Sequence, residues 1–431
     1  MKATIWPGAA QGKINIPPSK SMAHRAMICA ALAEGNSKIA GLAYSDDILA
    51  TLQCLEQLGA KIKRLPDGVE IQGIGGLAGL QQQKRKTKVD CWESGSTLRF
   101  LLPLFSLTGE EVHFIGRNRL LQRPQTVYQN IFQKQQLQFQ QDANGIYIKG
   151  ALQPGEYQIA GNISSQFITG LLFTLPLLQE DSCLIIQPPF ESRSYVLLTL
   201  QMLQRFGVVA HWLDENTLQI PGWQQFLPNC YTVEGDYSQL AFFAALGVLQ
   251  GGISCWGLQP DSLQGDRVIL DILTALGGRY QVLTEAGNTG YQFFLSELQG
   301  AVIDLADCPD LGPILMALAV CCQGQTKIIH AARLRLKESD RIAAMETELK
   351  KMGVAMQSGP DEVIIHGGPL QGPQEPLCGH KDHRIVMSLA VLATLAPQPV
   401  TILQAEAVRK SYPNFFTDLQ TLGVKVVLAD D

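Results

Sequence analysis

The feature that most constrains this chain is a short pattern that occurs six times, a polar or glycine-containing cluster that opens an apolar helix. The six openings begin at residues 18, 93, 162, 234, 307 and 380, so successive copies lie 69 to 75 residues apart. The copies are Pro18-Ser-Lys-Ser-Met-Ala-His-Arg25, Glu93-Ser-Gly-Ser-Thr-Leu-Arg99, Asn162-Ile-Ser-Ser-Gln-Phe167, Glu234-Gly-Asp-Tyr-Ser-Gln239, Asp307-Cys-Pro-Asp-Leu-Gly312 and His380-Lys-Asp-His-Arg384. A steady period of this size indicates a fold assembled from repeated supersecondary units.

Two further markers recur within the units. A second helix is expected to end on an apolar residue and a glycine, after which a new strand begins: Leu58-Gly59, Phe206-Gly207, Leu276-Gly277, Met352-Gly353 and Leu422-Gly423. The missing member should fall near Gln136, where the strand at Leu137–Phe139 begins without a glycine. Strands that end in glycine recur at Ile71-Gln-Gly73, Ile148-Lys-Gly150, Ile220-Pro-Gly222 and Ile365-His-Gly367. Each unit therefore holds two helices and several short strands, which predicts an α/β fold.

The number of units bears on the number of domains. Six units of this size exceed one hydrophobic core, because cores stop growing at about 250 to 300 residues. We therefore expect two domains, each of three units related by a pseudo-threefold axis. The segment Cys230–Glu234 is a candidate strand at the crossover between them.

Composition excludes several classes of protein. Only 17% of the 431 residues are charged, and the net charge is -5, so no basic field is present to hold a nucleic acid. The longest apolar runs, Phe167 to Leu178 and Leu311 to Cys322, are about a dozen residues, below the roughly 20 that a membrane-spanning helix needs. Residues Met1 to Gly12 do not resemble a secretory signal, so we expect a soluble, cytoplasmic protein without a membrane partner.

The sequence does not indicate a metal site or a bound cofactor. The ten cysteines are spread along the chain without a C-x-x-C pair, and His380 and His383 form the only close histidine pair, without a third ligand nearby. The run Gly73-Ile-Gly-Gly-Leu-Ala-Gly79 loosely matches a dinucleotide fingerprint, which requires a helix directly after its glycines. The following residues, Gln81–Lys86, are polar and are expected to form a solvated loop, so we reject a dinucleotide site.

Cations gather at the helix openings, where they are locally unfavourable because helix N-termini are themselves partly positive. They are Lys20, Arg25, Arg99, Arg123, Lys337, Arg341, Arg384 and Lys410. An anion between them would remove the conflict. The placement predicts a small ligand with more than one negative group.

Hydroxyl and amide side chains occupy the same openings. They are Ser19, Ser21, Ser94, Ser96, Ser164, Ser165, Gln166 and Ser192. One such residue per helix is explained as an N-cap, and the surplus is suited to phosphate or polyol oxygens. Two acids lie among the cations, Asp310 and Glu338, and offer a pair for proton transfer. Asp340 and Asp382 are interpreted as structural partners of neighbouring arginines.

At these residues the chain resembles a known family. Pro18-Ser-Lys-Ser-Met-Ala-His-Arg25, Gly161-Asn-Ile-Ser-Ser-Gln166, Leu336-Lys-Glu-Ser-Asp-Arg341, Asp382-His-Arg384 and Arg409-Lys-Ser-Tyr-Pro413 resemble the signatures of the 3-phosphoshikimate 1-carboxyvinyltransferases, or EPSP synthases. The resemblance covers the whole chain, in order. It implies two domains, each of three βαβαββ units in an inverted α/β barrel, that close over the substrates. It also implies the division into residues 19–233, on the shikimate-3-phosphate side, and residues 1–18 plus 234–431, with two chain crossings.

The resemblance implies the reaction and the site. The enolpyruvyl group of phosphoenolpyruvate would pass to the 5-hydroxyl of shikimate-3-phosphate in the shikimate pathway, which leads to chorismate and the aromatic amino acids. Shikimate-3-phosphate would contact Lys20, Ser21, Arg25, Ser164, Ser165, Gln166, Ser192, Asp310 and Lys337. Phosphoenolpyruvate would contact Lys20, Gly95, Arg123, Gln166, Arg341, Arg384 and Lys410. Asp310 would accept the hydroxyl proton, Glu338 would donate one to the enol methylene, and Lys20 would assist both. No cofactor or metal is implied, and a monomer is expected.

The chain departs from the family pattern at three places. Trp92-Glu93 stands where the family usually has Gly-Asn, Arg333 where an Asn is common, and Arg193-Ser194 where Lys-Pro is usual.

Two alternatives remain open at this point. A UDP-N-acetylglucosamine enolpyruvyl transferase would have Lys-Asn at residues 20 and 21 and a reactive loop cysteine, whereas no cysteine lies between Cys91 and Cys183. A non-catalytic anion-binding protein of the same fold would keep the cations but would need neither Asp310 nor Glu338.

Overall fold

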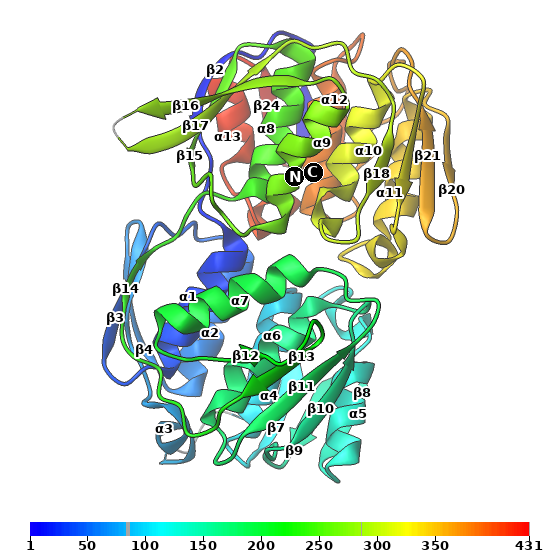
Figure 1. The fold of residues 1–431 in the computed structure, drawn as a ribbon. Coiled ribbons are helices and arrows are strands. Elements are labelled where there is room, and N and C mark those ends of the chain that lie inside the picture. The colour runs from blue at the N-terminus through cyan, green and yellow to red at the C-terminus, as the bar shows by residue number, and fades with distance from the viewer. Residues whose placement is uncertain (83–86, 286, 431) are drawn as a thin grey trace. The chain divides into compact units, whose positions relative to one another are not determined.

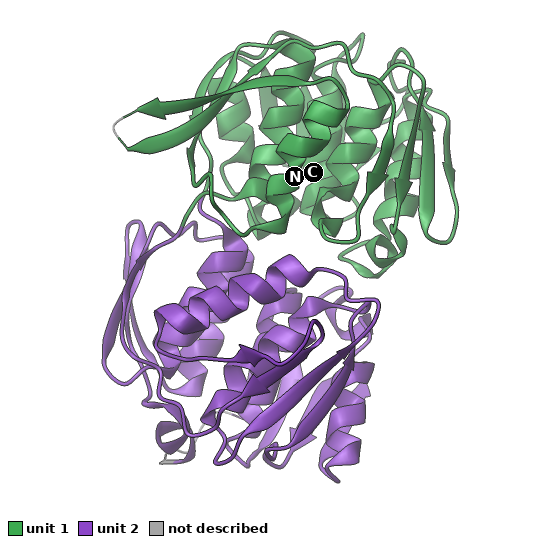
Figure 2. Cartoon of the chain, in the orientation of Figure 1, with its two compact units in different colours: residues 1–17, 234–431 green, residues 18–233 purple. Residues whose placement is uncertain are grey.

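The computed structural model describes residues 1–82, 87–285 and 287–430. The chain folds into two compact units, which are coloured separately in Figure 2. Unit 1 comprises Met1–Pro17 and Glu234–Asp431, and unit 2 comprises Pro18–Val233. The chain therefore passes between the units twice, as expected of a fold whose N-terminal strands complete the domain formed by the C-terminal half.

Unit 2 contains three βαβαββ repeats (Figure 1). The first consists of β14 (Cys230–Thr232), α1 (Lys20–Leu32), β3 (Asn36–Ala40), α2 (Asp46–Leu58), β4 (Lys61–Leu65) and β5 (Gly68–Gln72). The second consists of β6 (Lys88–Asp90), α4 (Gly95–Ser106), β7 (Glu111–Ile115), α5 (Thr126–Lys134), β8 (Gln138–Asp142) and β9 (Gly145–Lys149). The third consists of β10 (Glu156–Ala160), α6 (Ser165–Thr174), β11 (Ser182–Gln187), α7 (Arg193–Arg205), β12 (His211–Trp212) and β13 (Thr217–Ile220). Three short helices join these elements: α3 (Gly76–Gln82), η1 (Leu120–Gln122) and η2 (Leu175–Leu177).

Unit 1 repeats the same pattern. Its first repeat is β2 (Gly12–Asn15), α8 (Tyr237–Gln250), β15 (Ile253–Leu258), α9 (Ile269–Ala275), β16 (Arg279–Glu285) and β17 (Asn288–Phe294). Its second is β18 (Val302–Asp304), α10 (Gly312–Val320), β19 (Gln325–Ile329), α11 (Arg341–Lys351), β20 (Met356–Ser358) and β21 (Glu362–His366). Its third is β22 (Leu377–Cys378), α12 (His383–Ala393), β23 (Val400–Leu403), α13 (Phe415–Thr421), β24 (Val426–Ala429) and β1 (Lys2–Ile5). The 3₁₀ helices are η3 (Gly265–Val268), η4 (Pro309–Leu311), η5 (Ala332–Leu336) and η6 (Ala405–Lys410).

Each repeat forms its own small sheet, and the part of the chain that the structure describes contains six four-stranded sheets with one strand order. In the order β10-β11-β13-β12, the first pair is parallel and the other two pairs are antiparallel. Three sheets are completed from a distance, because β14 pairs with β3, β2 pairs with β15, and β1 lies between β23 and β24. The six predicted repeats and the predicted crossover strand are thus confirmed.

Helices form the interior of each unit. The opening helices of the repeats are buried almost all round, as in α8, where residues 237–248 are all buried, and α10, which is buried along its whole length. A helix that is apolar on every side has to lie inside a core. The sheets cover these helices and bury alternate residues, as the pattern in β10 illustrates. Because the opening helices begin at the predicted polar clusters, their N-termini present those clusters together at one end of each unit's core.

The glycine markers have two physical reasons. Gly207 and Gly353 follow helices with φ of 79° and 78°, a left-handed conformation that favours glycine. At the predicted gap in the series Gln136 takes the same conformation, with φ of 57°. A Cβ at Gly222 would lie 2.5 Å from the carbonyl oxygen of Glu180, so that glycine permits close approach of two chain segments.

The prediction of a loop at residues 81–86 was wrong for the first two of these residues. Residues 81 and 82 do not lie in a loop, because α3 follows Gly73-Ile-Gly-Gly76 directly. Residues 83–86, the rest of the predicted loop, lie outside the described residues. A dinucleotide site is still excluded, but for a different reason. The strand before α3 is β5, and its partners β3 and β4 are both antiparallel to it. A dinucleotide fingerprint needs a parallel βαβ unit.

Candidate active site

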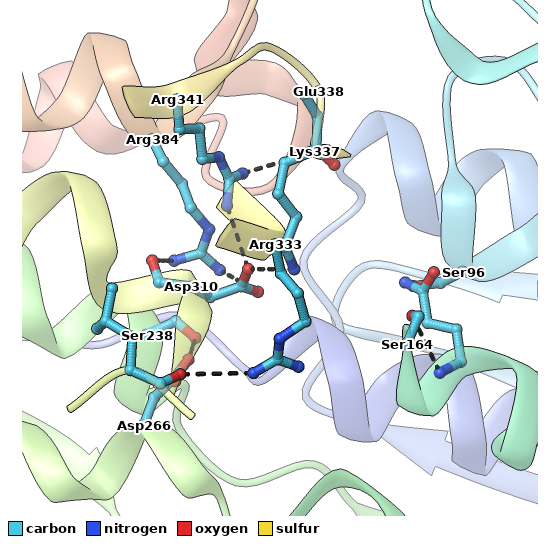
Figure 3. Close-up of polar contacts among 12 residues, drawn as sticks. Ser96, Ser164, Ser238, Asp266, Asp310, Arg333, Lys337, Glu338, Arg341 and Arg384 are labelled. Carbon is cyan, nitrogen blue, oxygen red and sulfur yellow. Dashed lines mark hydrogen bonds and ion pairs between the residues drawn. The ribbon is translucent and has the colours of Figure 1, made fainter. Parts of the chain in front are cut away.

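A cluster of three cations surrounds Asp310 in unit 1. Lys337 Nζ lies 3.1 Å from Asp310 Oδ1, Arg341 Nη1 lies 3.2 Å from the same oxygen, and Arg384 Nη2 lies 3.0 Å from Oδ2. The three side chains point toward Asp310 from different elements (Figure 3). Asp310 itself lies in η4, just before the first turn of α10. The predicted residues of this half of the chain are thus brought to one place.

Arg341 is the most deeply buried member, with 1% of its side chain exposed. Its Nε donates to Asp382 Oδ2 at 2.9 Å, and its Nη2 lies 2.8 Å from Glu338 Oε2. Asp382 is fully buried, caps α12 and also accepts a hydrogen bond from Ser339. The prediction that Asp382 is a structural partner of an arginine is confirmed. Asp340 likewise caps α11 and lies 3.3 Å from Arg335.

Glu338 lies next to the Asp310 cluster through shared cations. Its Oε2 contacts Arg341, and its Oε1 lies 3.9 Å from Lys410 Nζ. Lys410, at the end of η6, is 6% exposed. The two candidate acids are therefore linked by Arg341, which contacts both.

The electrostatics of the cluster follow from this packing. Burial would raise the pKa of Asp310, but Arg384, Lys337 and Arg341 outweigh it and hold that pKa well below its ordinary value. Burial lowers the pKa of Lys337, which Asp310 only partly offsets. Burial would also raise the pKa of Asp382, yet Arg341 brings it down to about 2. Asp310 and Asp382 are thus ionised and form ion pairs with the cations around them.

A further buried acid, Asp266, lies near this cluster. Asp266, in η3, is 2% exposed and accepts a hydrogen bond from Ser238 in α8. Burial, reinforced by the charge of Asp310, raises the pKa of Asp266 to about 6. Sequence reasoning missed this residue, because a single Asp in a Gly-Asp-Arg run gives no local signal of burial.

In unit 2, Lys20 is the first residue of α1 and points to α2. Its Nζ lies 2.7 Å from Asp47 Oδ2, and 17% of the lysine side chain is exposed. Asp47 is buried and was not predicted, since an acid in the first turn of a helix is ordinary. One turn further along α1, His24 Nδ1 lies 2.8 Å from Thr51 Oγ1, and Thr51 lies 2.6 Å from Thr97. These hydroxyls connect α1, through Thr51 of α2, to the first turn of α4.

Arg25 is buried, and all three nitrogens of its side chain donate hydrogen bonds within unit 2. Its Nη1 donates to the carbonyl oxygen of Ser21 at 2.7 Å, its Nε to Thr199 at 2.9 Å and its Nη2 to the carbonyl oxygen of Tyr195 at 3.0 Å. Burial lowers the pKa of Arg25 to about 10. Arg25 therefore fixes the start of α1 against α7, and the position of Ser21 with it.

Gly95, Arg123 and Gln166 lie together at the N-termini of α4 and α6. A Cβ at residue 95 would come within 2.6 Å of Arg123 Nη1 and 3.5 Å of Gln166 Oε1. Gln166 donates to Ser96 Oγ at 3.0 Å and accepts from Arg99 Nη1 at 2.9 Å. Arg99 was singled out as a cation but given no role, and the structure shows that it orients Gln166.

Only some of the serines at the helix openings act as N-caps. Ser164 Oγ accepts a hydrogen bond from the backbone N–H of Gln166 and caps α6, as Ser94 caps α4. Ser165, the next residue, is 8% exposed. Ser192 precedes α7 with φ of 56°, a left-handed conformation that non-glycine residues rarely adopt. One hydroxyl thus caps each of α1, α4 and α6, as expected, whereas Ser192 makes no side-chain capping hydrogen bond to α7.

The structure shows which groups contact the residues at the three departures from the family pattern. Glu93 Oε2 accepts a hydrogen bond from Asn118 at 3.0 Å, and the Trp92 ring lies under Arg117. Arg333 is buried and donates to the carbonyl oxygens of Leu305 and Ala306. Arg193 lies over the rings of Phe190 and Trp212.

Among residues 1–82, 87–285 and 287–430, we found no group of three His, Cys, Asp or Glu side chains arranged to hold a metal ion. Within the same ranges no helix combines the length and the apolar character needed to span a bilayer.

Comparison with known proteins identifies the family. The model of the EPSP synthase (3-phosphoshikimate 1-carboxyvinyltransferase) family matches residues 6–419. The 3-phosphoshikimate 1-carboxyvinyltransferase of Clostridium perfringens strain 13 is 42% identical over 98% of both chains, and that of Clostridium kluyveri is 42% identical over 98% of this chain and 97% of its own.

Solved structures agree with the sequence comparison. An EPSP synthase from Acinetobacter baumannii matches with a TM-score of 0.78 and 26% identity, over 99% of this chain and 100% of its own. The enolpyruvyl transferase NikO of Streptomyces tendae has a TM-score of 0.78 at 16% identity, over 99% of this chain and 98% of its own, and shares the fold. The chain therefore belongs to the EPSP synthase family of enzymes, the 3-phosphoshikimate 1-carboxyvinyltransferases.

Proposed function

We propose that this chain transfers the enolpyruvyl group of phosphoenolpyruvate to the 5-hydroxyl of shikimate-3-phosphate and releases phosphate, as a step of the shikimate pathway. The names of its relatives support this reaction. The observation that supports it best in the molecule is the arrangement in unit 1, where Arg341 contacts two acids, Asp310 and Glu338, within a group of cations. Two acids and several anchored cations suit a reaction that moves two protons between anionic substrates.

Phosphoenolpyruvate is assigned to cations and amides that are held in place before it binds. In unit 1 these are Arg341, Arg384 and Lys410, all at most 6% exposed. In unit 2 they are Lys20, Arg123, Gln166 and Gly95, and a Cβ at Gly95 would contact both Arg123 and Gln166. Arginine suits carboxylate and phosphate because its planar group donates two parallel hydrogen bonds. Little side-chain ordering remains for the ligand to impose.

Shikimate-3-phosphate is assigned to the serine-rich helix openings of unit 2. Lys20, Ser21 and Arg25 lie in α1, Ser164, Ser165 and Gln166 begin α6, and Ser192 precedes α7. The N-terminus of a helix favours a phosphate through its free N–H groups and its dipole. Asp310 and Lys337 of unit 1 complete the assignment.

Asp310 is assigned as the acceptor of the proton from the 5-hydroxyl. In the ligand-free protein its three cations disfavour protonation. Anionic substrates share those cations, so the affinity of Asp310 for a proton rises when the ligands are bound. The carboxylate thus becomes an effective base only when a substrate is present to react.

Glu338 is assigned as the donor to the enol methylene. Addition of the hydroxyl oxygen to the enol carbon and of a proton to the methylene gives a tetrahedral adduct that carries carboxylate, phosphate and a methyl group. Loss of phosphate and of a methyl proton then restores the double bond and completes the transfer. Lys20 and the arginines stabilise the charge on carboxylate and phosphate in both steps.

The comparisons favour this reaction over the alternatives, since the matching family and the curated relatives are 3-phosphoshikimate enzymes. A location in the cytoplasm and a monomeric state stay predictions.

Phosphate release by the purified protein tests the proposal. With phosphoenolpyruvate and shikimate-3-phosphate, one phosphate is expected for each enolpyruvyl ether formed, as measured by a phosphate assay and mass spectrometry. Replacement of the acceptor by UDP-N-acetylglucosamine should abolish release. Release with that sugar nucleotide would favour the first alternative, and no release with either acceptor would favour a binding protein.

A further inference from the structure

The segment that leads into α12 contains a strained turn that the proposed mechanism does not use. The backbone N–H of Asp382 donates to the carbonyl oxygen of Gly379 at 2.9 Å, and the two residues between them, His380 and Lys381, have φ of 50° and 54°. A hydrogen-bonded turn with positive φ at both central positions is a type I′ turn, which glycine, asparagine and aspartate normally fill. Neither His380 nor Lys381 relieves this strain, so contacts outside the turn have to hold it.

The turn matters because of the residues that follow it. Asp382 caps α12 and receives Arg341 Nε at 2.9 Å. Arg384, in the first turn of α12, donates to the carbonyl oxygen of Asp310 at 2.9 Å and lies 3.0 Å from its carboxylate. The conformation of residues 379–382 therefore sets the direction in which Arg384 leaves the helix.

A buried carboxylate holds the turn from the side. Glu348 is 1% exposed, and its Oε1 lies 2.8 Å from His380 Nε2. Its Oε2 accepts a hydrogen bond from the backbone N–H of Cys378 at 2.9 Å and lies 3.0 Å from Lys351 Nζ. Burial would raise the pKa of Glu348, but the hydrogen bond from His380 and those from Cys378 and Lys351 lower it below its ordinary value. The carboxylate is thus anchored by the strand before the turn and by the first residue at its centre.

The position of Glu348 gives this contact its effect on the site. Glu348 lies on α11, seven residues after Arg341, and residues two turns apart share one face of a helix. Two residues of that face contact the 378–382 segment, Arg341 through Asp382 and Glu348 through Cys378 and His380. Two contacts fix both the distance and the rotation of a helix, whereas one would leave it free to pivot.

We propose that Glu348 and His380 form a positioning pair that holds the type I′ turn and thereby orients Arg384 toward the carboxylate or phosphate of its substrate. The inference rests on the proposed role of Arg384 in binding phosphoenolpyruvate. Glu348 and His380 touch no substrate in this account, so they are positioning residues and not catalytic ones.

The chain offers a matched pair of glycine variants at adjacent turn positions. His380→Gly relieves the positive φ and removes the contact with Glu348, whereas Lys381→Gly relieves the positive φ and keeps that contact. If backbone strain alone mattered, the two variants would behave alike. With a positioning pair, His380→Gly raises KM for phosphoenolpyruvate about tenfold, because misplacement of a binding group by an ångström costs this much or more. KM for shikimate-3-phosphate stays within twofold, and Lys381→Gly stays within twofold of wild type for both substrates.

A second set of variants guards against a general effect on folding. Glu348→Gln, which keeps the shape of the side chain, is expected to match His380→Gly, and the double variant should be no worse than either single one. His380→Gln, whose amide can still donate to Glu348, should restore part of the affinity. Equal kinetics for His380→Gly and Lys381→Gly, or equal loss of affinity for both substrates, would overturn the proposal.

Hydrogen–deuterium exchange of the peptide that covers residues 377–386 separates this inference from the proposed function. Exchange should be faster in His380→Gly than in Lys381→Gly, whether or not the protein turns over the two substrates. An inactive wild type would contradict the proposed function and leave the exchange difference as the test of the pair. Identical exchange in the two variants would contradict the pair, even in an active enzyme.

Discussion

Arg384 contacts Asp310 at two points, through Nη2 at 3.0 Å from Oδ2 and through Nη1, which donates to the backbone carbonyl at 2.9 Å. The same guanidinium thus holds the carboxylate and the backbone of the residue to which we assign the base. An anionic ligand that competes for Arg384 would therefore remove an ion pair from the Asp310 carboxylate and a hydrogen bond from its backbone at the same time. The guanidinium assigned to phosphoenolpyruvate therefore also orders the residue assigned as the base.

Loss of either acid should remove turnover more than binding. Asp310→Asn and Glu338→Gln keep size and shape but remove a proton-transfer group, so we expect kcat to fall about 100- to 10,000-fold. Binding of shikimate-3-phosphate, followed by isothermal titration calorimetry, should persist at least in part. Asp307→Asn, an exposed acid near Asp310, is the control. If both variants kept kcat within a few-fold of wild type, the assignment of the proton transfers would be wrong.

Lys20→Met should impair both binding and rate, since this ammonium is assigned to both substrates. The substitution also removes the ion pair that Lys20 makes with the buried Asp47 at 2.7 Å, so we expect a loss of stability of about 1 to 3 kcal/mol. Lys61→Met, on the exposed strand β4, serves as the matched substitution. Steady-state kinetics and thermal unfolding of the two variants give the comparison, and equal kinetic effects would make Lys20 an ordinary surface cation.

Gly95→Ala should weaken phosphoenolpyruvate binding selectively. The added methyl would lie 2.6 Å from Arg123 Nη1, so the guanidinium has to move away from the N-terminus of α4. We expect KM for phosphoenolpyruvate to rise about tenfold while shikimate-3-phosphate binding changes little. Gly8→Ala is the control, because a Cβ there meets nothing within 4 Å. An unchanged KM in Gly95→Ala would place the phosphoenolpyruvate site elsewhere.

The buried His24 should make unit 2 sensitive to acid. Burial lowers the pKa of His24 to about 3 from an ordinary 6.5. Between these values the unfolded chain binds more protons than the folded one, so stability is complete above pH 6.5 and falls as the pH drops toward 3. From about pH 7 to about pH 5 the loss should be about 2 kcal/mol.

Denaturant unfolding at the two pH values checks this expectation. His24→Asn, which retains a polar atom for Thr51, should be less stable overall but should lose about 2 kcal/mol less between the two pH values. His211→Asn, at an exposed position in β12, should keep the wild-type dependence. A His24→Asn variant with the wild-type dependence on pH would show that another group is responsible.

Much of the fold could be predicted from the sequence because its markers are local. N-cap serines such as Ser94 and Ser164, and terminal glycines such as Gly207, act within a few residues of themselves, so they mark helix ends in the sequence. The wrong prediction of a loop at residues 81 and 82 also arose because only local sequence signals were available. A polar run is compatible with a short surface helix as well as with a loop, and no capping residue separates the two cases.

The partners within the candidate site could not be predicted in this way. Asp47 lies 27 residues from Lys20, and Asp310 lies 74 residues from Arg384, and nothing local to either acid indicates its cation. The roles of the site residues came from the family resemblance, and the structure adds how they are held. Glu348 illustrates the limit well, since a glutamate in a Lys-rich helix is ordinarily exposed and only the fold shows that it is buried.

The most direct test of the account is the reaction run in heavy water, with the product methylene analysed by mass spectrometry. Addition and elimination convert the methylene to a methyl group and back, so the proton delivered through Glu338 comes from solvent. The account predicts deuterium in the product methylene of the wild-type reaction and much slower formation of that product in Glu338→Gln. A product formed at the normal rate without deuterium would contradict the tetrahedral adduct, and with it the roles assigned to Asp310 and Glu338.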